Sequence, residues 1–346
     1  MNKRVTIKTI ATKVGVHYST VSLALNNHPS IPAATRERIE KAAKSLGYRR
    51  DPVLSALVAY RSNTRPPAEY GVIAWVDLWT TKESVGDRYG ELWKGASQRA
   101  NAFGWKLEPF RLAFAGISTA QLSKILHSRG IEGILIPPVP ETDMSLELEW
   151  SRFSAVTIGQ SLHNPGLHRV IPHQLSNMRT IWAKLAELGY RRVGLHLTPE
   201  DNDRSRHDWL AAFLECEFSS GKKRPAAPWI RYLQTGKEFV QWVRRHRFDA
   251  IISTHPDQAI AALEKEGIAV PRDVGVASPR NESRLVKRKI TAVDECFETV
   301  GMRAVDSLVG MMHRNEKGFP EMPLQVMVAG KLVEGDTVLA QRHDTA

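Results

Sequence analysis

Two hydrophobic patterns divide the chain into two regions. Near the N-terminus, apolar residues recur with the three- and four-residue spacing of helices. From about residue 70 onward, short apolar runs alternate with amphipathic segments, as in a doubly wound parallel sheet. The pattern therefore predicts a small all-α unit followed by a larger α/β unit.

The first region predicts three short helices. Thr6 can cap the first, Gly15 can provide the turn after it, and Pro32 precedes the third. The residues expected to face the core are Ile7, Ile10, Ala11 and Val14, then Val21, Ala24 and Leu25, and finally Ile39, Ala42, Ala43 and Leu46. Two short helices joined by a tight turn form a helix-turn-helix, whose second helix presents its first residues to base edges.

The second region begins after a proline-containing linker at 65–68. The predicted strands are YGVIAWVDL, WKLEPFRL, IEGILIPP, FSAVTIGQ, RRVGLHL, FDAIIST and VGVAS. The predicted helices are GDRYGELWKGASQRANAFG, STAQLSKILHSRG, LSNMRTIWAKLAELGY, WLAAFLEC, FVQWVRRH, DQAIAALEKEG and ETVGMRAVDSLVGMMHRN. With 346 residues, the chain has room for a small domain and a two-lobed larger one.

Charge is distributed unevenly along the chain. Of the formal net charge of +11, residues 1–65 carry +9. A basic head on a nearly neutral body favours a polyanionic partner, although a solvated basic terminus is the alternative. The first residues lack the apolar core of a signal peptide, and no apolar run has membrane-spanning length, so we expect a cytoplasmic protein. Cys216 and Cys296 fit no metal spacing, and we expect neither a metal nor a cofactor.

The segment TIKTIATKVGVHYSTVSLALNN, followed by TRERIEKAAKSLGY, resembles the DNA-binding head of the lactose/galactose repressor (LacI/GalR) family. Segments of the body, including AKLAELGYRRVGLH and ITAVDECFETVGMRAVDSLVGMM, resemble that family's effector domain. The resemblance implies a helix-turn-helix head over residues 1–50, a hinge helix and linker over 51–69, and a body over 70–346. The body is expected to have the two lobes and parallel sheets of a periplasmic binding protein.

The resemblance also implies which residues contact DNA. Tyr18 and Ser19 are expected to hydrogen-bond to base edges, whereas Leu23 offers apolar contact with a thymine methyl group. Leu23 departs from the basic or polar residue common there. Thr20 and Ser22 would contact phosphates. The full predicted DNA-binding set is Thr6, Tyr18, Ser19, Thr20, Ser22, Leu23, Asn26 and Leu57.

Leu57 lies in the segment DPVLSALVAYRS, which matches the family's hinge helix. In the family this helix pairs with that of the second subunit and wedges a leucine into the minor groove. Arg50 stands where proline is usual, and Pro52 follows, so the hinge here is expected to start later or bend differently. An apolar linker packed on the body is the alternative.

The resemblance places a small ligand between the lobes, at the C-terminal ends of strands. Aromatic faces can stack on sugar rings, and charged or amide groups can fix hydroxyls or carboxylates. The effector-binding candidates are Asp77, Trp79, Tyr89, His173, Arg204, Arg206, Trp209, His255, Arg280 and Asn281. Any one of them could instead be ordinary surface.

Two departures from the family pattern change the expected ligand. His173 stands where the family often has an aspartate, and Ser278, Pro279, Arg280 and Asn281 replace a G-F-D-D run. The arginine that the family has before its G-F is also out of register. More cationic residues favour an anionic or acid-sugar ligand or an unusual glycan fragment. A body that has lost its ligand response is the alternative.

Other classes of function fit less well. The sequence contains no phosphate-binding glycine loop, metal-binding histidine pair or nucleophile elbow, so we do not expect an enzyme. A free solute-binding protein would have no basic helix-turn-helix. We therefore expect a homodimeric regulator that binds a near-palindromic operator, represses carbohydrate-related genes and responds to a small effector. The rival is an architectural DNA-binding protein with a vestigial sensor.

Overall fold

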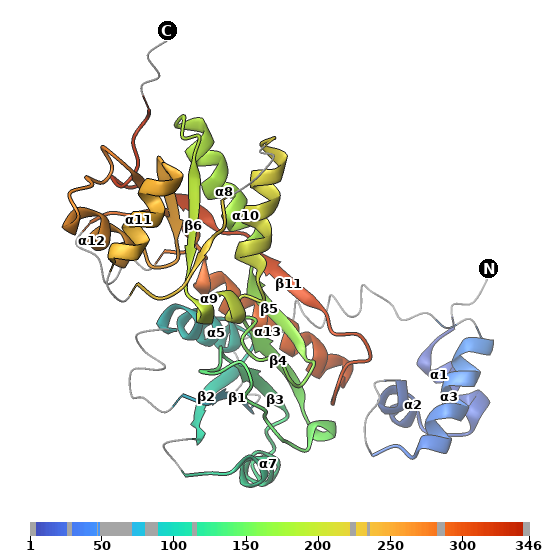
Figure 1. The fold of residues 1–346 in the computed structure, drawn as a ribbon. Helices are drawn as coiled ribbons and strands as arrows, with labels where there is room; N and C mark the ends of the chain where they lie inside the picture. The colour runs from blue at the N-terminus through green and yellow to red at the C-terminus, as the bar shows by residue number, and fades with distance from the viewer. Residues whose placement is uncertain are drawn as a thin grey trace.

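A computed structural model describes most of the chain: residues 5–25, 30–46, 48, 71–79, 89–112, 116–221, 226–233, 236–281 and 288–341. These residues form a helical head and an α/β body with two separate six-stranded sheets (Figure 1). We name the halves of the body lobe 1 and lobe 2, after the order in which their sheets begin.

The head contains helices α1 (Ile7–Val14), α2 (Tyr18–Leu25) and α3 (Ala33–Ser45). Thr6 caps α1, and Gly15 ends it with a left-handed backbone at φ 72°, as the sequence predicts. The small core between the helices consists of Ile10, Ala11, Val21, Ala24, Ile31, Ile39 and Ala43. Ala42 and Leu46 pack at its margin, so the predicted three-helix arrangement is confirmed.

Lobe 1 is a fully parallel sheet with the strand order β11-β5-β4-β3-β1-β2. Its elements are β1 (Gly71–Asp77), α5 (Gly90–Ala102), β2 (Trp105–Arg111), α7 (Thr119–Ser128), β3 (Gly133–Ile136), the 3₁₀ turn η2 (Trp150–Arg152), β4 (Ser154–Ile158), β5 (His168–Pro172), α13 (Phe297–Arg314) and β11 (Gln325–Val328). Helices α5 and α13 cover one face of the sheet, and α7 covers the other.

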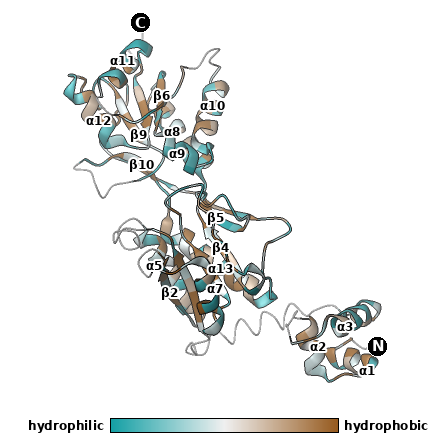
Figure 2. Ribbon diagram, turned by 60° about the horizontal axis from the view of Figure 1, so that its bottom comes forward, coloured by the Kyte–Doolittle hydropathy of each residue, from teal (hydrophilic) through white to brown (hydrophobic). Residues whose placement is uncertain are grey.

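Lobe 2 has the strand order β12-β10-β9-β8-β6-β7, in which only β12 is antiparallel to its neighbour. Its elements are α8 (Gln174–Glu187), β6 (Val193–Leu197), α9 (Pro199–Arg204), α10 (Asp208–Ser219), β7 (Trp229–Ile230), α11 (Lys237–His246), β8 (Ala250–Ser253), α12 (Pro256–Lys265), β9 (Gly275–Ser278), β10 (Thr291–Asp294) and β12 (Lys331–Val333). Helices α8 and α10 pack on one face, and α11 and α12 pack on the other. Hydrophobic residues concentrate on the strands inside each lobe (Figure 2).

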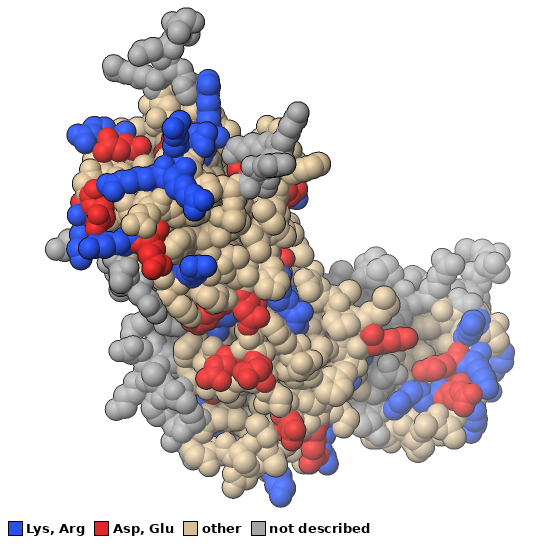
Figure 3. All heavy atoms as spheres, viewed as in Figure 1, with Lys and Arg blue, Asp and Glu red and all other residues tan. Residues whose placement is uncertain are grey.

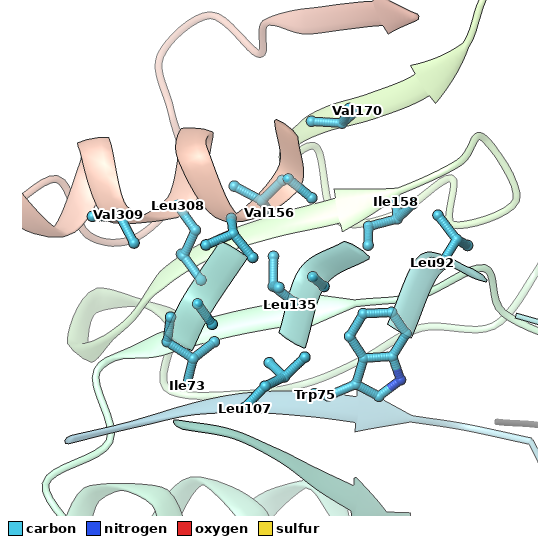
Figure 4. Close-up of a cluster of buried hydrophobic side chains, with 14 of the residues drawn as sticks. Ile73, Trp75, Leu92, Leu107, Leu135, Val156, Ile158, Val170, Leu308 and Val309 are labelled. Carbon is cyan, nitrogen blue, oxygen red and sulfur yellow. The ribbon is translucent and has the colours of Figure 1, made fainter. Parts of the chain in front are cut away.

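Two glycines set the distance between α5 and α13. A Cβ atom on Gly95 would lie 1.9 Å from the carbonyl oxygen of Glu298, and one on Gly301 would lie 2.2 Å from that of Leu92. Only glycine permits this close approach. The two helices therefore sit tightly over the core of lobe 1, in which Leu92 and Leu308 meet Trp75 and its neighbours on the sheet (Figure 4).

The chain crosses between the lobes three times, after β5, after β10 and after β11. The crossings are tied to one another: the backbone amide of His173 donates to the carbonyl of Val328, and that of Gly330 donates to the Asn177 side chain, at 2.8 and 3.0 Å. Gln174 also donates to Glu295 at 2.9 Å. Three short, linked crossings form the kind of connection that permits hinge motion between lobes.

The predicted body fold is therefore confirmed, with additions. Each predicted strand and helix has a counterpart, but α9, β5, β7, β10, β11 and β12 were not predicted as separate elements. Strands β11 and β12 complete sheets that begin far earlier in the chain. Such long-range pairing has no local periodic signal.

Candidate functional site

The start of α2 exposes the side chains predicted to read DNA bases. Tyr18 is 52% exposed and Leu23 is 36% exposed, while Val21 on the opposite face is fully buried. Ser19 is also exposed, and its hydroxyl lies 2.7 Å from His17 Nδ1. The small core of the head thus holds α2 with a polar and aromatic face toward solvent, the arrangement that a recognition helix requires.

The other predicted DNA-binding residues occupy different positions. Thr6 accepts a hydrogen bond from the Thr9 amide as the cap of α1. Thr20, in the first turn of α2, is partly exposed. Ser22 belongs to α2, but its side chain lies outside the described structure, as do Asn26, Leu57 and the proposed hinge. The roles of this set remain predictions.

Basic side chains cluster on the head. Figure 3 shows several Lys and Arg groups on its visible face, with Asp and Glu groups between them. Lys13 and Arg38 each bond to a partner in another helix, the Ser45 hydroxyl and the Val14 carbonyl, at 2.9 and 3.0 Å. Their ammonium and guanidinium groups keep further donors that are suited to phosphate oxygens.

In the body, the turn between α9 and α10 of lobe 2 is bonded to lobe 1. Arg204 Nη1 donates to the carbonyl oxygens of Val139 and Pro140 at 2.7 and 2.8 Å. Gln160 Nε2 donates to Asp208 Oδ2 at 2.7 Å, and the Thr142 hydroxyl donates to Asp203. We call this turn, residues 203–208, the latch, because it bonds to the lobe 1 loops that follow β3 and β4.

The latch has a strained backbone. Arg206 and His207 have φ values of 52° and 64°, in the left-handed region that residues with a Cβ avoid. Strain of this kind persists where surrounding bonds hold it and is common in segments that switch. The latch therefore combines interlobe bonds with a conformation that is costly to maintain.

Three of the predicted effector residues, Asp77, Trp79 and Tyr89, lie in the part of lobe 1 that meets Arg204. Trp79 donates from Nε1 to the Pro138 carbonyl at 2.7 Å and from its backbone amide to Asp77 Oδ1 at 3.0 Å. The Trp79 ring lies 6.1 Å from that of Tyr89 and 5.9 Å from the Arg204 guanidinium. The structure thus brings Asp77, Trp79, Tyr89 and Arg204 together as an aromatic and charged wall.

The lobe 2 side is organised around a residue absent from the predicted set, Asp201. Its buried carboxylate lies 2.9 Å from His255 Nε2 and 3.3 Å from Arg280 Nη1, and it accepts from the Thr254 hydroxyl at 2.7 Å. Burial raises the pKa of Asp201, but the bond from His255, the charge of Arg280 and the Thr254 bond outweigh it, so the pKa falls below its usual range. Arg280 also lies over the Trp209 ring, 5.7 Å from its centroid.

Asp201 changes the expected charge of the cleft. The sequence argument counted His255 and Arg280 as cationic replacements for missing acids. In the structure, both share the carboxylate of Asp201, which lies on α9 rather than at the family's usual acidic positions. That part of the lobe 2 wall is therefore neutralised, and the argument for an anionic ligand from these two residues is weakened.

A buried histidine supports the same wall. His196 is fully buried in β6, and its Nδ1 lies 2.8 Å from the Ser253 hydroxyl, which in turn accepts from the His255 amide at 3.0 Å. Burial lowers the pKa of His196 to about 4. His196 is therefore neutral near pH 7 and holds the loop that carries His255.

The remaining predicted effector residues are spread more widely. His173 lies at the crossing after β5, where its Nδ1 accepts from the Ser176 amide at 3.3 Å and caps α8. Trp209 is only 4% exposed, and its Nε1 has no hydrogen-bond partner among the described residues. Arg206 is exposed in the latch, and Asn281 follows Arg280. His173 thus has a structural role of its own, while Trp209 keeps an unused donor.

Sequence reasoning missed Asp201, which organises the lobe 2 cluster, and it missed Asp203 and Asp208, which bond to lobe 1. Asp201, Asp203 and Asp208 all lie in the run PEDNDRSRHDW, directly after a predicted strand, and that position was the available signal. Gln160 follows β4 in the same way, but its bond to Asp208 depends on how the lobes face each other.

Other kinds of site find no support in the described part of the chain. No group of three His, Cys, Asp or Glu side chains there could hold a metal ion, and no helix there is long and apolar enough to span a membrane. Cys216 and Cys296 are both free thiols.

Two protein families match separate parts of the chain. Residues 6–51 match the lacI family of bacterial regulatory proteins, and residues 182–338 match the periplasmic binding protein-like domain. The first match covers the head and the second covers most of lobe 2 together with α13 and β11. These matches agree with the domain types inferred from the sequence.

Full-length comparisons point the same way. The HTH-type transcriptional regulator IpsA of Corynebacterium glutamicum is 22% identical over 347 residues, covering 92% of this chain and 94% of its own. A complex of the transcriptional regulator CelR with cellobiose has a TM-score of 0.59 at 19% identity, covering 96% and 100% of the two chains. The lac repressor dimer bound to operator and the anti-inducer ONPF has a TM-score of 0.56 at 19% identity, covering 98% and 100%. The structural likenesses establish the shared fold.

Proposed function

Because the chain is a lacI-family DNA-binding regulator, we propose that it represses transcription by binding a near-palindromic operator as a homodimer, under the control of a small carbohydrate-related effector. The observation that carries the proposal is the exposed face of α2, where Tyr18, Ser19 and Leu23 stand on a basic head. Tyr18 and Ser19 would read polar base edges, and Leu23 would contact a thymine methyl group.

Control by an effector would act through the lobes. A ligand that binds better to one lobe arrangement shifts the population toward it by its difference in affinity. The latch and the three linked crossings offer two elements that such a shift would move. The proposed hinge around Leu57 would transmit the change, because paired hinge helices need the two bodies at a set spacing. The coupling typically changes affinity by a factor of roughly 5–150.

The test of DNA reading is selection of bound fragments from genomic DNA by the purified full-length protein. We expect a near-palindromic site with two half-sites related by the two-fold axis of the dimer. Tyr18→Ala should relax the preference at one position in each half-site and cost about 1–3 kcal/mol. Lys13→Ala should weaken binding to all sequences about equally. Recovery of no preferred sequence would favour an architectural role and overturn the proposal.

For the effector, we propose a carbohydrate or sugar-acid ligand between the aromatic wall of lobe 1 and the Asp201 wall of lobe 2. Trp79 offers an aromatic face, and Arg204 and Arg280 offer groups for hydroxyls or carboxylates. The cellobiose complex of CelR, a protein of the same fold, fits this class of ligand.

A thermal-shift panel of neutral sugars and sugar acids tests the ligand class. Binding to the folded state raises the midpoint in a concentration-dependent way. Stabilisation by acids would support the sugar-acid form, and stabilisation only by neutral sugars would exclude it. If no member of the panel raises the midpoint, the proposed ligand class is wrong, while the proposal of a DNA-binding regulator stands. Trp79→Ala is the variant expected to abolish a true response.

A further inference from the structure

A second group of polar residues has buried groups that the contacts described above do not satisfy. Arg169, in β5 of lobe 1, is only 5% exposed. Its Nη2 donates to the Leu162 carbonyl at 3.3 Å, whereas its Nη1 is buried without a hydrogen-bond partner in the described structure. No carboxylate among the described residues forms an ion pair with it. A buried guanidinium with an unused donor is costly unless something satisfies it.

His163 presents a second unused group beside it. The residue follows Leu162 in the loop after β4, and its Nε2 is buried without a partner in the described structure. Burial lowers the pKa of His163, and so do the charges of Arg206 and Arg169, while Asp203 opposes them. Arg169 donates to the carbonyl of Leu162, the residue directly before His163, so the guanidinium and the imidazole belong to adjoining parts of lobe 1.

Arg206 contributes the lobe 2 side of this group. It sits in the strained turn of the latch, is exposed, and has no carboxylate partner among the described residues. Its charge also lowers the pKa of Arg169, after the larger effect of burial. Asp203, the acid that opposes the lowering of the His163 pKa, accepts a hydrogen bond from Thr142. The group therefore has an excess of positive charge.

The loops that carry these residues already face each other. Gln160, three residues before His163, bonds to Asp208, two residues after Arg206, at 2.7 Å. This contact joins the loop that carries His163 to the latch, which carries Arg206. We propose that Arg169, His163 and Arg206 form a binding site for an oxyanion or carboxylate group that bridges the two lobes.

An anion at this site would change the balance between lobe arrangements. Without it, the like charges of Arg169 and Arg206 disfavour each other, as the lowering of the Arg169 pKa by Arg206 indicates. With it, both guanidinium groups gain charge-assisted hydrogen bonds, which are stronger than neutral ones. The group bound could be a free inorganic anion or an acid group on the effector. The site goes beyond the proposed function, because its occupation needs neither DNA nor a sugar.

The test uses the full-length protein without DNA and two sets of probes. Inorganic phosphate and sulfate represent free anions, and gluconate with its neutral counterpart glucose represents an acid group on a sugar. Binding is followed by isothermal titration and thermal shift, with sodium chloride at matched ionic strength as the reference. Arg206→Ala should weaken binding about tenfold, and Arg169→Met should abolish it. Arg245→Ala, which removes an equal charge from an exposed position on α11, should leave it unchanged.

A measurement that does not require a ligand distinguishes a defined site from a general attraction of anions to the positively charged surface. The pKa of His163, followed by NMR of its ring protons, should rise in Arg206→Ala because a repelling charge is removed. The same pKa should rise in the wild-type protein when phosphate saturates the site. Since Arg206 is exposed, this variant should fold normally.

Each outcome either supports or overturns the proposed anion site. Binding of phosphate or sulfate supports a site for free anions, and binding of gluconate alone supports an acid group on the effector. Binding that Arg245→Ala weakens as much as Arg206→Ala would show diffuse attraction and overturn the proposal. Absence of binding by every anion, or an unchanged His163 pKa in Arg206→Ala, would also overturn it.

Discussion

Replacement of Asp201 by asparagine tests the account of lobe 2. Asp201→Asn keeps the shape of the side chain and a possible bond to Thr254, but removes the charge shared by His255 and Arg280. The side chains of Asp201, Arg280 and His255 are 10%, 17% and 26% exposed, so solvent screens them little. The arginine would be left without its carboxylate in a largely buried site.

The expected cost follows from this burial. Removing one partner of a buried ion pair typically costs about 3–5 kcal/mol, and the retained hydrogen bonding of asparagine reduces this to about 2–4 kcal/mol. A domain of this size loses about 2–4 °C of midpoint per kcal/mol. The thermal midpoint of lobe 2 should therefore fall by roughly 5–15 °C in calorimetry.

The difference in stability between the wild type and Asp201→Asn should also depend on pH. The folded pKa of Asp201 lies below its unfolded value of about 3.9, so the stabilisation is complete above that value and is lost as pH falls through the folded pKa. The gap between wild type and Asp201→Asn should thus be largest near neutral pH and shrink below about pH 4. Asp273→Asn, at a surface pair with Arg272, is the control and should lose no measurable stability. Equal midpoints for Asp201→Asn and wild type near neutral pH would refute the reasoning.

Three further predictions follow from other parts of the molecule. The pKa of His196 is about 4 in the folded protein and about 6.5 in the unfolded chain, so the wild type should lose roughly 3 kcal/mol of stability as pH falls from 6.5 to about 4. His196→Gln should remove this loss. The same pH dependence of stability in urea titrations of the variant and the wild type would contradict this. Arg204→Ala should release the latch and increase the radius of gyration in small-angle X-ray scattering, with Arg179→Ala as a surface control; identical scattering curves would show that the bonds to Val139 and Pro140 do not hold the lobes. Ile10→Ala should cost the head about 2–5 kcal/mol and abolish DNA binding, while the midpoint of the body stays the same; retained binding would mean that the head has more stability than so small a core suggests.

The sequence predicted local structure well where one segment carries the whole signal. Thr6 and Gly15 delimit α1, and the apolar spacing of Val21 and Ala24 orients α2, so the exposed positions of Tyr18 and Leu23 follow directly. The alternation of strands and helices in the body was equally visible. Each of these features depends on neighbours within a few residues.

The interlobe contacts could not be predicted in the same way. Arg204 was a candidate because of its place after a strand, but its bonds to Val139 and Pro140 join segments more than sixty residues apart. The role of Asp201 depends on the loops after β8 and β9 arriving beside α9, which the linear sequence does not specify. The missed β11 and β12 have the same cause, since each strand pairs with a sheet formed much earlier in the chain.

Titration of the selected operator with the full-length protein, with and without the stabilising ligand from the thermal-shift panel, tests the central claim most directly. The account predicts tight binding of the operator over scrambled DNA and a change in operator affinity of roughly 5–150-fold when ligand is added. Equal affinity for operator and scrambled DNA, or an operator affinity that no body ligand alters, would contradict a regulator whose head is controlled by its two-lobed body.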